Sequence, residues 1–309
     1  MFEMKLDRHI SKITLGTVQL GLDYGIANKE GKPDEGKAFK IIDTALANGI
    51  NCFDTAAGYG DSEKVIGKYF TTGKRKRSDI TIVTKFKLGQ IHASNVEIVM
   101  MRSVEQSLKN LNTNYIDILL IHDAKEFSTF AKNITKVYEN LLTDGIIKGA
   151  GASCYEFSEI KPMLSYDIYQ AFQIPVNILD TRITKSEGVM SLNNKLVFAR
   201  SVFLQGLFFM DTSHLKGNLK GMGEYIITIK NIAVEMNISI TQLAVTYVRS
   251  LQYIDSLVIG VDNPGQISEN TKYVDSELFP QDVMDSINKR LKGAPDWIFM
   301  PYLWDKQKD

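Results

Sequence analysis

The sequence predicts an α/β protein folded as a single (β/α)8 barrel, the TIM barrel fold. Short apolar segments rich in β-branched residues recur along the chain, and segments with helical periodicity separate them. Eight such units occur, the number of units in a closed barrel. No glycine-rich GxGxxG turn follows any predicted strand, although a doubly wound dinucleotide-binding sheet would normally carry one.

The predicted strands are short, and a helical segment follows most of them. Strands that alternate with helices form a parallel sheet, because a short loop cannot return the chain to the same end of the sheet. In chain order, the strands are expected at residues 13–16, 52–55, 81–85, 116–121, 149–153, 171–176, 196–201 and 256–259.

Residues that can cap helices mark several helix starts. Asp34, Ser94, Ser239 and Asn263 each precede a helical segment, and the last three have Glu or Gln three positions later, the spacing of a capping box. No linker rich in Pro, Gly or Ser interrupts the pattern. We therefore expect one domain over residues 1–309.

Charge and cysteine content narrow the class of partner. The chain has 36 basic and 36 acidic residues, so no net field attracts nucleic acid or an anionic membrane. Its apolar runs are shorter than the about 20 residues that span a bilayer, and the N-terminus lacks the apolar region of a signal peptide. Two cysteines suit reduced thiols and offer too few ligands for a metal site. We expect a cytoplasmic monomer or small homo-oligomer with a small-molecule partner.

Polar residues stand where three consecutive predicted strands end. Asp54 and Tyr59 follow the second strand, Lys85 ends the third and His122 ends the fourth. In a barrel these positions converge at the C-terminal mouth. A lysine beside a phenol stabilises the tyrosinate and lowers the pKa of the phenol, while Asp54 can hold the lysine charged and oriented. The set predicts transfer of one proton to or from a substrate oxygen.

Each of these residues also has a structural interpretation. Asp54 could form a turn, Lys85 could extend to solvent, and His122 could be a core histidine bonded to the backbone. Four such residues at successive strand ends favour the catalytic interpretation, because chance would rarely place them together.

Three segments resemble motifs of the aldo/keto reductase superfamily. GINCFDTAAGYGDSE is similar to its GxxxxDTAxxYGxSE signature, TIVTKF to its lysine strand and LLIHDA to its histidine strand. The resemblance extends from LGTVQLG near residue 15 to GQISEN near residue 270. It implies NAD(P)H-dependent reduction of an aldehyde or ketone, including sugars or other polyhydroxylated carbonyls, with Tyr59 as general acid. The implied catalytic tetrad is Asp54, Tyr59, Lys85 and His122.

The same resemblance implies that NADP or NAD lies extended across the barrel mouth. Ser153 and Gln173 match residues that hold the nicotinamide carboxamide, and Arg200 occupies the place where many members stack a tyrosine on the nicotinamide. The other implied cofactor residues are Ser201, Gln205 and Gly206 at the pyrophosphate, and Asp262, Gln266, Glu269 and Asn270 at the adenosine end.

The adenosine end departs from the superfamily pattern. Asp262 and Gln266 stand where NADP-preferring members usually offer Lys or Arg. A carboxylate repels a 2′-phosphate but can accept hydrogen bonds from a free ribose, which favours NAD. Lys272, one helical turn away, could compensate.

Two other functions are compatible with the sequence. A preference for NAD fits a sugar or alcohol dehydrogenase that works in the oxidative direction. The superfamily also includes channel β-subunits, so a nucleotide-binding regulatory subunit with little turnover is the second alternative. Two segments are candidate walls of the substrate pocket: the loop from Gly21 to Pro33, and the aromatic C-terminal tail, which could instead pack against the barrel.

Overall fold

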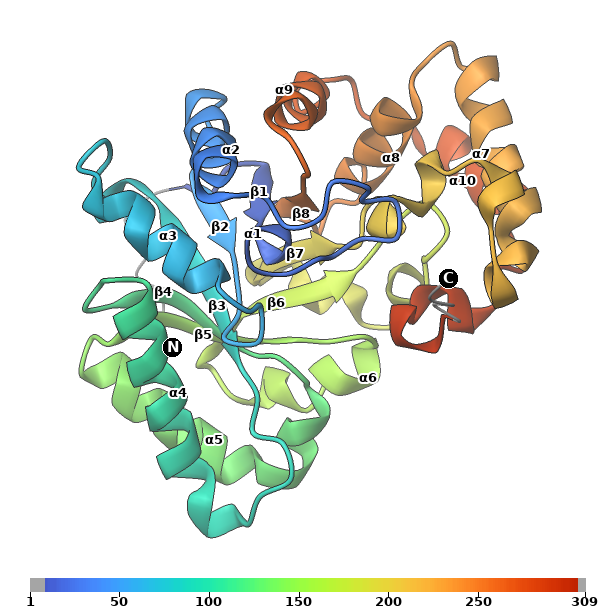
Figure 1. Cartoon of the computed structure of the whole chain (residues 1–309). Coiled ribbons are helices and arrows are strands. Elements are labelled where there is room, and N and C mark those ends of the chain that lie inside the picture. Colours follow the sequence, from blue (N-terminus) through green and yellow to red (C-terminus); the bar gives the residue numbers. More distant parts are fainter. Residues whose placement is uncertain (1–8, 305–309) are drawn as a thin grey trace.

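The computed structural model describes residues 9–304, and its eight parallel strands close into one barrel (Figure 1). This confirms the predicted single (β/α)8 barrel, whose expected ends at residues 1 and 309 lie outside the described residues. The observed strand ends differ from the predicted ones by at most two residues. The strands are β1 (Ile13–Gly16), β2 (Cys52–Asp54), β3 (Thr81–Phe86), β4 (Ile116–Ile121), β5 (Ile147–Ser153), β6 (Tyr169–Pro175), β7 (Leu196–Arg200) and β8 (Ser256–Gly260).

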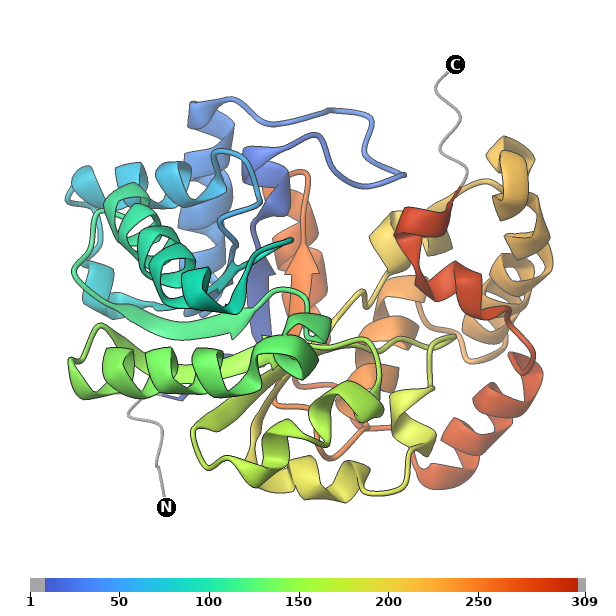
Figure 2. The same cartoon turned by 90° about the horizontal axis from the view of Figure 1, so that it is seen from below.

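Helices surround the barrel in both views (Figures 1 and 2). Between β5 and β6 the only α-helix is the short α6, and the connection from β6 to β7 contains 3₁₀ turns instead of an α-helix. The α-helices are α1 (Val18–Gly21), α2 (Glu35–Ala47), α3 (Ser62–Thr71), α4 (Val96–Asn110), α5 (Lys125–Thr143), α6 (Phe157–Ile160), α7 (Gly223–Glu235), α8 (Ile240–Arg249), α9 (Pro264–Lys272) and α10 (Gln281–Arg290).

Three of the four predicted caps are present. Asp34, Ser239 and Asn263 each accept a hydrogen bond from the backbone N–H three residues later. The prediction for Ser94 is wrong, because α4 begins at Val96, after a 3₁₀ turn over Ala93–Asn95, and has no side-chain cap. Val96, the first residue of this helix, is fully buried in the core, where packing stabilises the helix without a side-chain cap.

The inner face of the barrel changes from apolar to polar toward its C-terminal mouth. Apolar side chains from five strands form a small core inside the barrel, and side chains two positions further along a strand face the same side. Two positions on from Cys52, Val83, Leu120, Ala171 and Phe198 stand Asp54, Lys85, His122, Gln173 and Arg200, in that order. The barrel register therefore directs five of the predicted site residues into one space above this core.

Two segments flank the mouth of the barrel. One is the loop of residues 22–34 between α1 and α2, here called the β1 loop, and the other is the C-terminal segment; Figure 2 shows both at the same end of the barrel. The β1 loop reaches the chain that follows β7, since a Cβ atom on Gly206 would lie 2.6 Å from the Cβ atom of Ala27. None of the helices in residues 9–304 is long and apolar enough to cross a membrane.

Candidate active site

A buried ion pair lies at the centre of the barrel mouth. Lys85 Nζ donates hydrogen bonds to Asp54 Oδ1 at 2.7 Å and to the backbone carbonyl of Thr55 at 2.9 Å. Gln173 Nε2 donates to the same Asp54 oxygen at 2.7 Å. Because buried charges are stable only when they are paired and hydrogen-bonded, these contacts hold Lys85 and Asp54 in one arrangement. Burial lowers the pKa of Lys85, and the Asp54 carboxylate opposes that shift.

Tyr59 and His122 complete the predicted tetrad beside this pair. The ammonium nitrogen of Lys85 lies 4.9 Å from the centre of the Tyr59 ring, and the rings of Tyr59 and His122 meet edge to face at 5.6 Å. Burial, followed by the nearby cations Lys85 and Arg200, lowers the pKa of His122 to about 3. His122 is therefore neutral at physiological pH and can donate one hydrogen bond while it accepts another.

The pKa of Tyr59 moves in the direction opposite to the one expected from the sequence. Burial and then the Asp54 carboxylate raise the pKa of the phenol above its ordinary value of 10.0, while Arg200 lowers it. The expected net lowering of this pKa is wrong because burial, the largest effect, and the Asp54 carboxylate together outweigh the effect of nearby cations. Tyr59 is consequently protonated at neutral pH, which suits a proton donor.

The backbone around Tyr59 is fixed by residues that the sequence analysis did not assign to the site. A Cβ atom on Gly21 would lie 1.8 Å from the Tyr59 carbonyl oxygen, so α1 passes directly against the Tyr59 loop. Ser62 donates from its backbone N–H to that carbonyl at 3.1 Å. The hydroxyl of Ser62 bonds to the hydroxyls of Thr17 and Thr55 at 2.8 and 2.9 Å. In the sequence, the second glycine of LGTVQLG (Gly21) and the serine of GDSE (Ser62) were the features that could have indicated these contacts.

Three predicted cofactor residues lie at or near the C-terminal ends of neighbouring strands on one side of the mouth. Ser153 of β5 and Gln173 of β6 are register partners, and both are buried. Arg200 ends β7, and its guanidinium stacks on the Tyr155 ring at 4.3 Å. Arg200 Nη1 also donates to Ser201 Oγ at 3.4 Å. Gln173 thus has two contacts to account for: its observed hydrogen bond to Asp54, and the expected one to the nicotinamide carboxamide.

The chain after β7 has an unusual backbone. Ser201, Leu204, Gln205 and Gly206 have positive φ angles of 64°, 48°, 56° and 84°. Such left-handed conformations cost free energy in residues other than glycine and gather at functional sites. Successive N–H groups in turns of this kind form anion-binding concavities. Ser201, Gln205 and Gly206 are the residues that the sequence assigned to the pyrophosphate.

A buried acceptor atom without a partner lies where β1 and β8 end. Gln19 Oε1 of α1 receives no hydrogen bond from residues 9–304. A Cβ atom on Gly260, at the end of β8, would lie 2.5 Å from the Gln19 amide, so this amide packs directly against the glycine backbone. A buried amide oxygen needs a donor, and a hydroxyl-rich ligand at this place supplies one. The residues present therefore fit a dinucleotide, and the sequence pattern alone did not point to Gln19.

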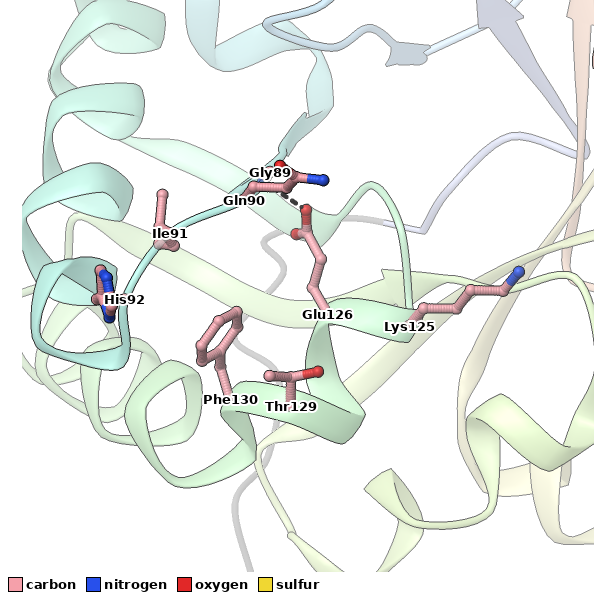
Figure 3. Close-up of a pocket in the computed structure, with 8 residues that line it drawn as sticks. All are labelled: Gly89, Gln90, Ile91, His92, Lys125, Glu126, Thr129 and Phe130. Carbon is pink, nitrogen blue, oxygen red and sulfur yellow. Dashed lines mark hydrogen bonds between the residues drawn. The ribbon is translucent and has the colours of Figure 1, made fainter.

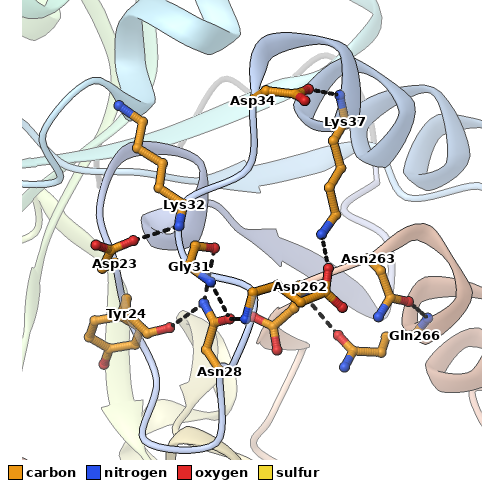
Figure 4. A network of polar contacts seen from close by, with 11 residues as sticks. Asp23, Tyr24, Asn28, Gly31, Lys32, Asp34, Lys37, Asp262, Asn263 and Gln266 are labelled. Atoms are coloured by element: carbon orange, nitrogen blue, oxygen red, sulfur yellow. Dashed lines mark hydrogen bonds and ion pairs between the residues drawn. The ribbon is translucent and has the colours of Figure 1, made fainter.

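Figure 4 shows the predicted adenosine end, where the β1 loop meets the start of α9. Gln266 Oε1 accepts a hydrogen bond from the Asp262 backbone N–H at 2.7 Å. Burial raises the pKa of Asp262, and the carboxylate of Glu30 adds to that rise. Lys37 of α2 opposes the rise and forms an ion pair with Glu30. The carboxylate of Glu269, by contrast, accepts a hydrogen bond from Thr241 of α8 at 2.9 Å, and Asn270 is buried in α9.

The β1 loop is cross-linked by hydrogen bonds (Figure 4). Asn28 Oδ1 accepts from the Gly31 N–H at 3.1 Å, and Asp23 Oδ1 accepts from the Lys32 N–H at 2.6 Å. Lys32 Nζ forms an ion pair with Asp61 at 2.9 Å, beside the start of α3. These contacts hold the loop across the mouth as a wall between α2 and the chain after β7.

A separate cavity of about 560 Å³ lies beside the chain that follows β3 (Figure 3). Its lining includes His92 and Lys125, together with Glu126. Glu126 accepts hydrogen bonds from the backbone N–H groups of Leu88 and Gly89 at 2.9 Å, which fixes this chain segment. None of the four tetrad residues lines this cavity.

Within residues 9–304 no group of His, Cys, Asp and Glu could hold a metal ion.

Comparison with known proteins identifies the family to which this chain belongs. The profile of the Aldo/keto reductase family matches residues 12–292, and the chain belongs to this family of oxidoreductases. It is 26% identical over 182 residues to norsolorinic acid reductase of Aspergillus flavus, covering 52% of this chain and 46% of that protein. It is 29% identical over 194 residues to the aldo-keto reductase YhdN of Bacillus subtilis, covering 60% of this chain and 56% of that protein. The matches thus span about half the length of these relatives.

The fold has relatives of the same class among solved structures. The holo form of an aldo-keto reductase from Bacillus halodurans superposes with a TM-score of 0.77 at 24% identity. That match covers 94% of this chain and 95% of the other. At this identity the likeness concerns the barrel fold.

Proposed function

We propose that this chain is an NAD(P)H-dependent reductase that converts an aldehyde or ketone to an alcohol, with Tyr59 as the proton donor. The observation that carries the proposal is the protonated Tyr59 phenol beside the Lys85–Asp54 pair and neutral His122. Membership of the aldo/keto reductase family supports it, as do relatives named as reductases.

The proposed cofactor residues surround the mouth. Ser153, Gln173 and Arg200 would hold the nicotinamide end, and the chain from Ser201 to Gly206 would bind the pyrophosphate through its backbone N–H groups. Gln19, Asp262 and Gln266 would bind the adenosine end, with Glu269 and Asn270 on α9, the helix that carries Gln266. The reduced nicotinamide, when bound, supplies the hydride that the carbonyl carbon accepts.

The four tetrad residues act together in the transfer of one proton to the carbonyl oxygen. Tyr59 donates its hydroxyl proton to the carbonyl oxygen, and the Lys85 ammonium beside the ring stabilises the tyrosinate that remains. Asp54 orients Lys85, and Gln173 orients Asp54. Neutral His122 donates a hydrogen bond to the same substrate oxygen and directs it toward Tyr59.

Charge at the adenosine end supports NAD over NADP. Asp262 lies near a second carboxylate, Glu30, and the ammonium of Lys37 is paired with Glu30. A 2′-phosphate would add negative charge to this group, whereas ribose hydroxyls can donate hydrogen bonds to it. Cys52 and Cys154 are buried free thiols, in keeping with the reducing cytoplasm that we propose as the compartment.

The decisive assay follows the loss of NADH or NADPH absorbance with a panel of aldehydes, ketones and keto-sugars. Tyr59→Phe should abolish turnover and leave cofactor binding nearly intact. Tyr253→Phe is the matched control. The buried Tyr253 hydroxyl has no hydrogen-bond partner in residues 9–304, and Tyr253 itself precedes β8, at the other end of the barrel. Cofactor binding without turnover of any substrate would instead support the regulatory alternative.

A further inference from the structure

Asn177 is a fully buried polar side chain that the proposed chemistry does not use. It lies just after β6, and its exposed fraction is 0%. Its Oδ1 accepts hydrogen bonds from the backbone N–H groups of Leu179 and Asp180, each at 2.9 Å. Its Nδ2 donates to the backbone carbonyl of Ser201 at 3.2 Å, across 24 positions of sequence. Because two donors face one end of the amide and a carbonyl faces the other, only one orientation of the amide satisfies all three contacts.

The carbonyl that Asn177 holds belongs to the first residue of the turn assigned to the pyrophosphate. Ser201 has a φ angle of 64°, a left-handed conformation that costs free energy in residues other than glycine. The Ser201 carbonyl also accepts a hydrogen bond from the Leu204 N–H at 2.9 Å, which closes the turn. The second hydrogen bond to this oxygen comes from Asn177. The Asn177 side chain therefore offsets part of the cost of the strained conformation.

The same turn contains backbone donors without an acceptor. The N–H groups of Val202 and Phe203 form no hydrogen bond with the part of the chain that the structure describes. A backbone N–H that is removed from water needs an acceptor, and an anionic oxygen supplies one. The turn that Asn177 holds thus offers donors to an anion such as the proposed pyrophosphate.

Asn177 is itself fixed by the chain that follows it. Its backbone N–H donates to the Asp180 carbonyl at 3.4 Å. The buried Asp180 carboxylate accepts two hydrogen bonds from the Arg182 guanidinium, at 2.8 and 2.9 Å. That guanidinium stacks on Phe299 of the C-terminal segment at 5.0 Å. Because the hydrogen bonds of Asn177 go to buried backbone groups of its own chain, a bound cofactor does not compete for them.

We propose that Asn177 is a positioning residue for the cofactor, which keeps the turn from Ser201 to Gly206 in the shape that directs backbone N–H groups at the pyrophosphate. This role rests on the proposed reductase function, because that function supplies the dinucleotide. Within the described range Asn177 forms no hydrogen bond with the tetrad or with the residues assigned to the adenosine end. Its loss should therefore weaken binding of the pyrophosphate and leave binding of adenosine unchanged.

Asn177→Ser tests this role. A serine hydroxyl can replace the turn contacts to Leu179 and Asp180, but it is too short to reach the Ser201 carbonyl as well. The measured quantity is the dissociation constant of adenosine divided by that of ADP-ribose, which carries the pyrophosphate. Asn177→Ser should lower this ratio about fivefold, because it removes one hydrogen bond from the turn. Asn177→Asp, which keeps the size and the acceptor of the side chain but not its donor, should lower the ratio as well. A wild-type ratio in both variants would overturn the proposal.

Asn51→Ser is the matched control. Asn51 Nδ2 likewise donates to a backbone carbonyl, that of His9, at 2.9 Å, and Asn51 Oδ1 accepts from the Ser11 N–H at 2.9 Å. This residue directly precedes β2, at the end of the barrel opposite the mouth. Its substitution should leave the ratio within about twofold of the wild-type value.

A second background separates positioning of the turn from a general loss of stability. Glycine adopts the left-handed conformation without strain, so the turn needs less support in a Ser201→Gly chain. Asn177→Ser should therefore lower the ratio by less in that chain than in the wild type. Equal losses in the two backgrounds would show that Asn177 acts on the fold as a whole and not on the turn.

If the wild type binds neither adenosine nor ADP-ribose, the proposed function fails first. Amide hydrogen exchange at Leu204, whose N–H bonds to the Ser201 carbonyl, then decides whether Asn177 holds the turn. Faster exchange in Asn177→Ser than in Asn51→Ser supports this role, and equal exchange in the two variants overturns it.

Discussion

Gly21 lies so close to Tyr59 that a Cβ atom on the glycine would stand 1.8 Å from the Tyr59 carbonyl oxygen. Gly21→Ala should therefore push the Tyr59 loop away from Lys85. A displacement of about 1 Å at a catalytic group costs on the order of 10²-fold in rate, so kcat should fall by about 10- to 100-fold. Steady-state kinetics with a saturating carbonyl would measure the loss.

Gly221→Ala is the control for this glycine, because a Cβ atom there meets nothing within 4 Å. It should leave kcat unchanged. A Gly21→Ala variant with wild-type kcat would show that the Tyr59 loop tolerates displacement.

Removing one partner of the buried ion pair should destabilise the barrel. Lys85→Met leaves the Asp54 carboxylate buried without its cation, which typically costs about 3–5 kcal/mol in the free energy of unfolding. The double variant Asp54→Asn, Lys85→Met should recover part of that stability and none of the activity. Chemical denaturation measures the first effect, and the carbonyl assay measures the second.

Lys87→Met provides the comparison for this prediction, since Lys87 is exposed and lies 3.6 Å from Asp123. A surface pair contributes about 0–1 kcal/mol. Equal losses for Lys85→Met and Lys87→Met would contradict the buried-pair argument.

Cofactor preference should respond to the acidic group at the adenosine end. Asp262→Arg should improve binding of NADPH relative to NADH by about tenfold or more, because it replaces a repulsive charge with a phosphate ligand. Glu30→Gln should shift the ratio in the same direction, because it removes a carboxylate and frees Lys37. The shift should be smaller than in Asp262→Arg, because this substitution introduces no new cation. Titration of each variant with both cofactors gives the ratio. Asp282→Arg on α10 is the control, and an unchanged ratio in Asp262→Arg would remove Asp262 from the cofactor site.

His122 should make stability depend on pH. Its pKa is about 3 in the folded chain, against an ordinary value of 6.5. Between these values the unfolded chain binds a proton that the folded chain does not, so stability is complete above 6.5 and falls as the pH drops below it. The slope is at most about 1.4 kcal/mol per pH unit, reduced here because the side chain is partly exposed.

His122→Gln should weaken this dependence. Between about pH 7 and about pH 5, the wild type should lose about 1 kcal/mol more unfolding free energy than the variant. Urea denaturation at the two pH values measures the difference. Parallel losses in the two proteins would show that His122 does not titrate as its burial implies.

Local sequence pattern was sufficient for the barrel and for the position of the tetrad. Apolar strands that alternate with helices have few compact solutions, and parallel strands bring their C-terminal ends to one face. Since side chains repeat with a period of two along a strand, Asp54 and Lys85 had to follow Cys52 and Val83 on the inner face. These properties depend on neighbours in the chain, which a sequence displays directly.

How these residues interact depends on contacts between distant parts of the folded chain. The Gln173 amide meets Asp54 across 119 positions of sequence, and the Gln19 amide lies against Gly260 at the far end of the chain. The direction of the Tyr59 pKa likewise depended on the balance of burial, Asp54 and Arg200. The order of residues along the chain was enough to predict the barrel and which residues reach its mouth. Their hydrogen bonds and protonation required the folded chain, because both depend on distances and solvent exclusion that only the closure of the barrel establishes.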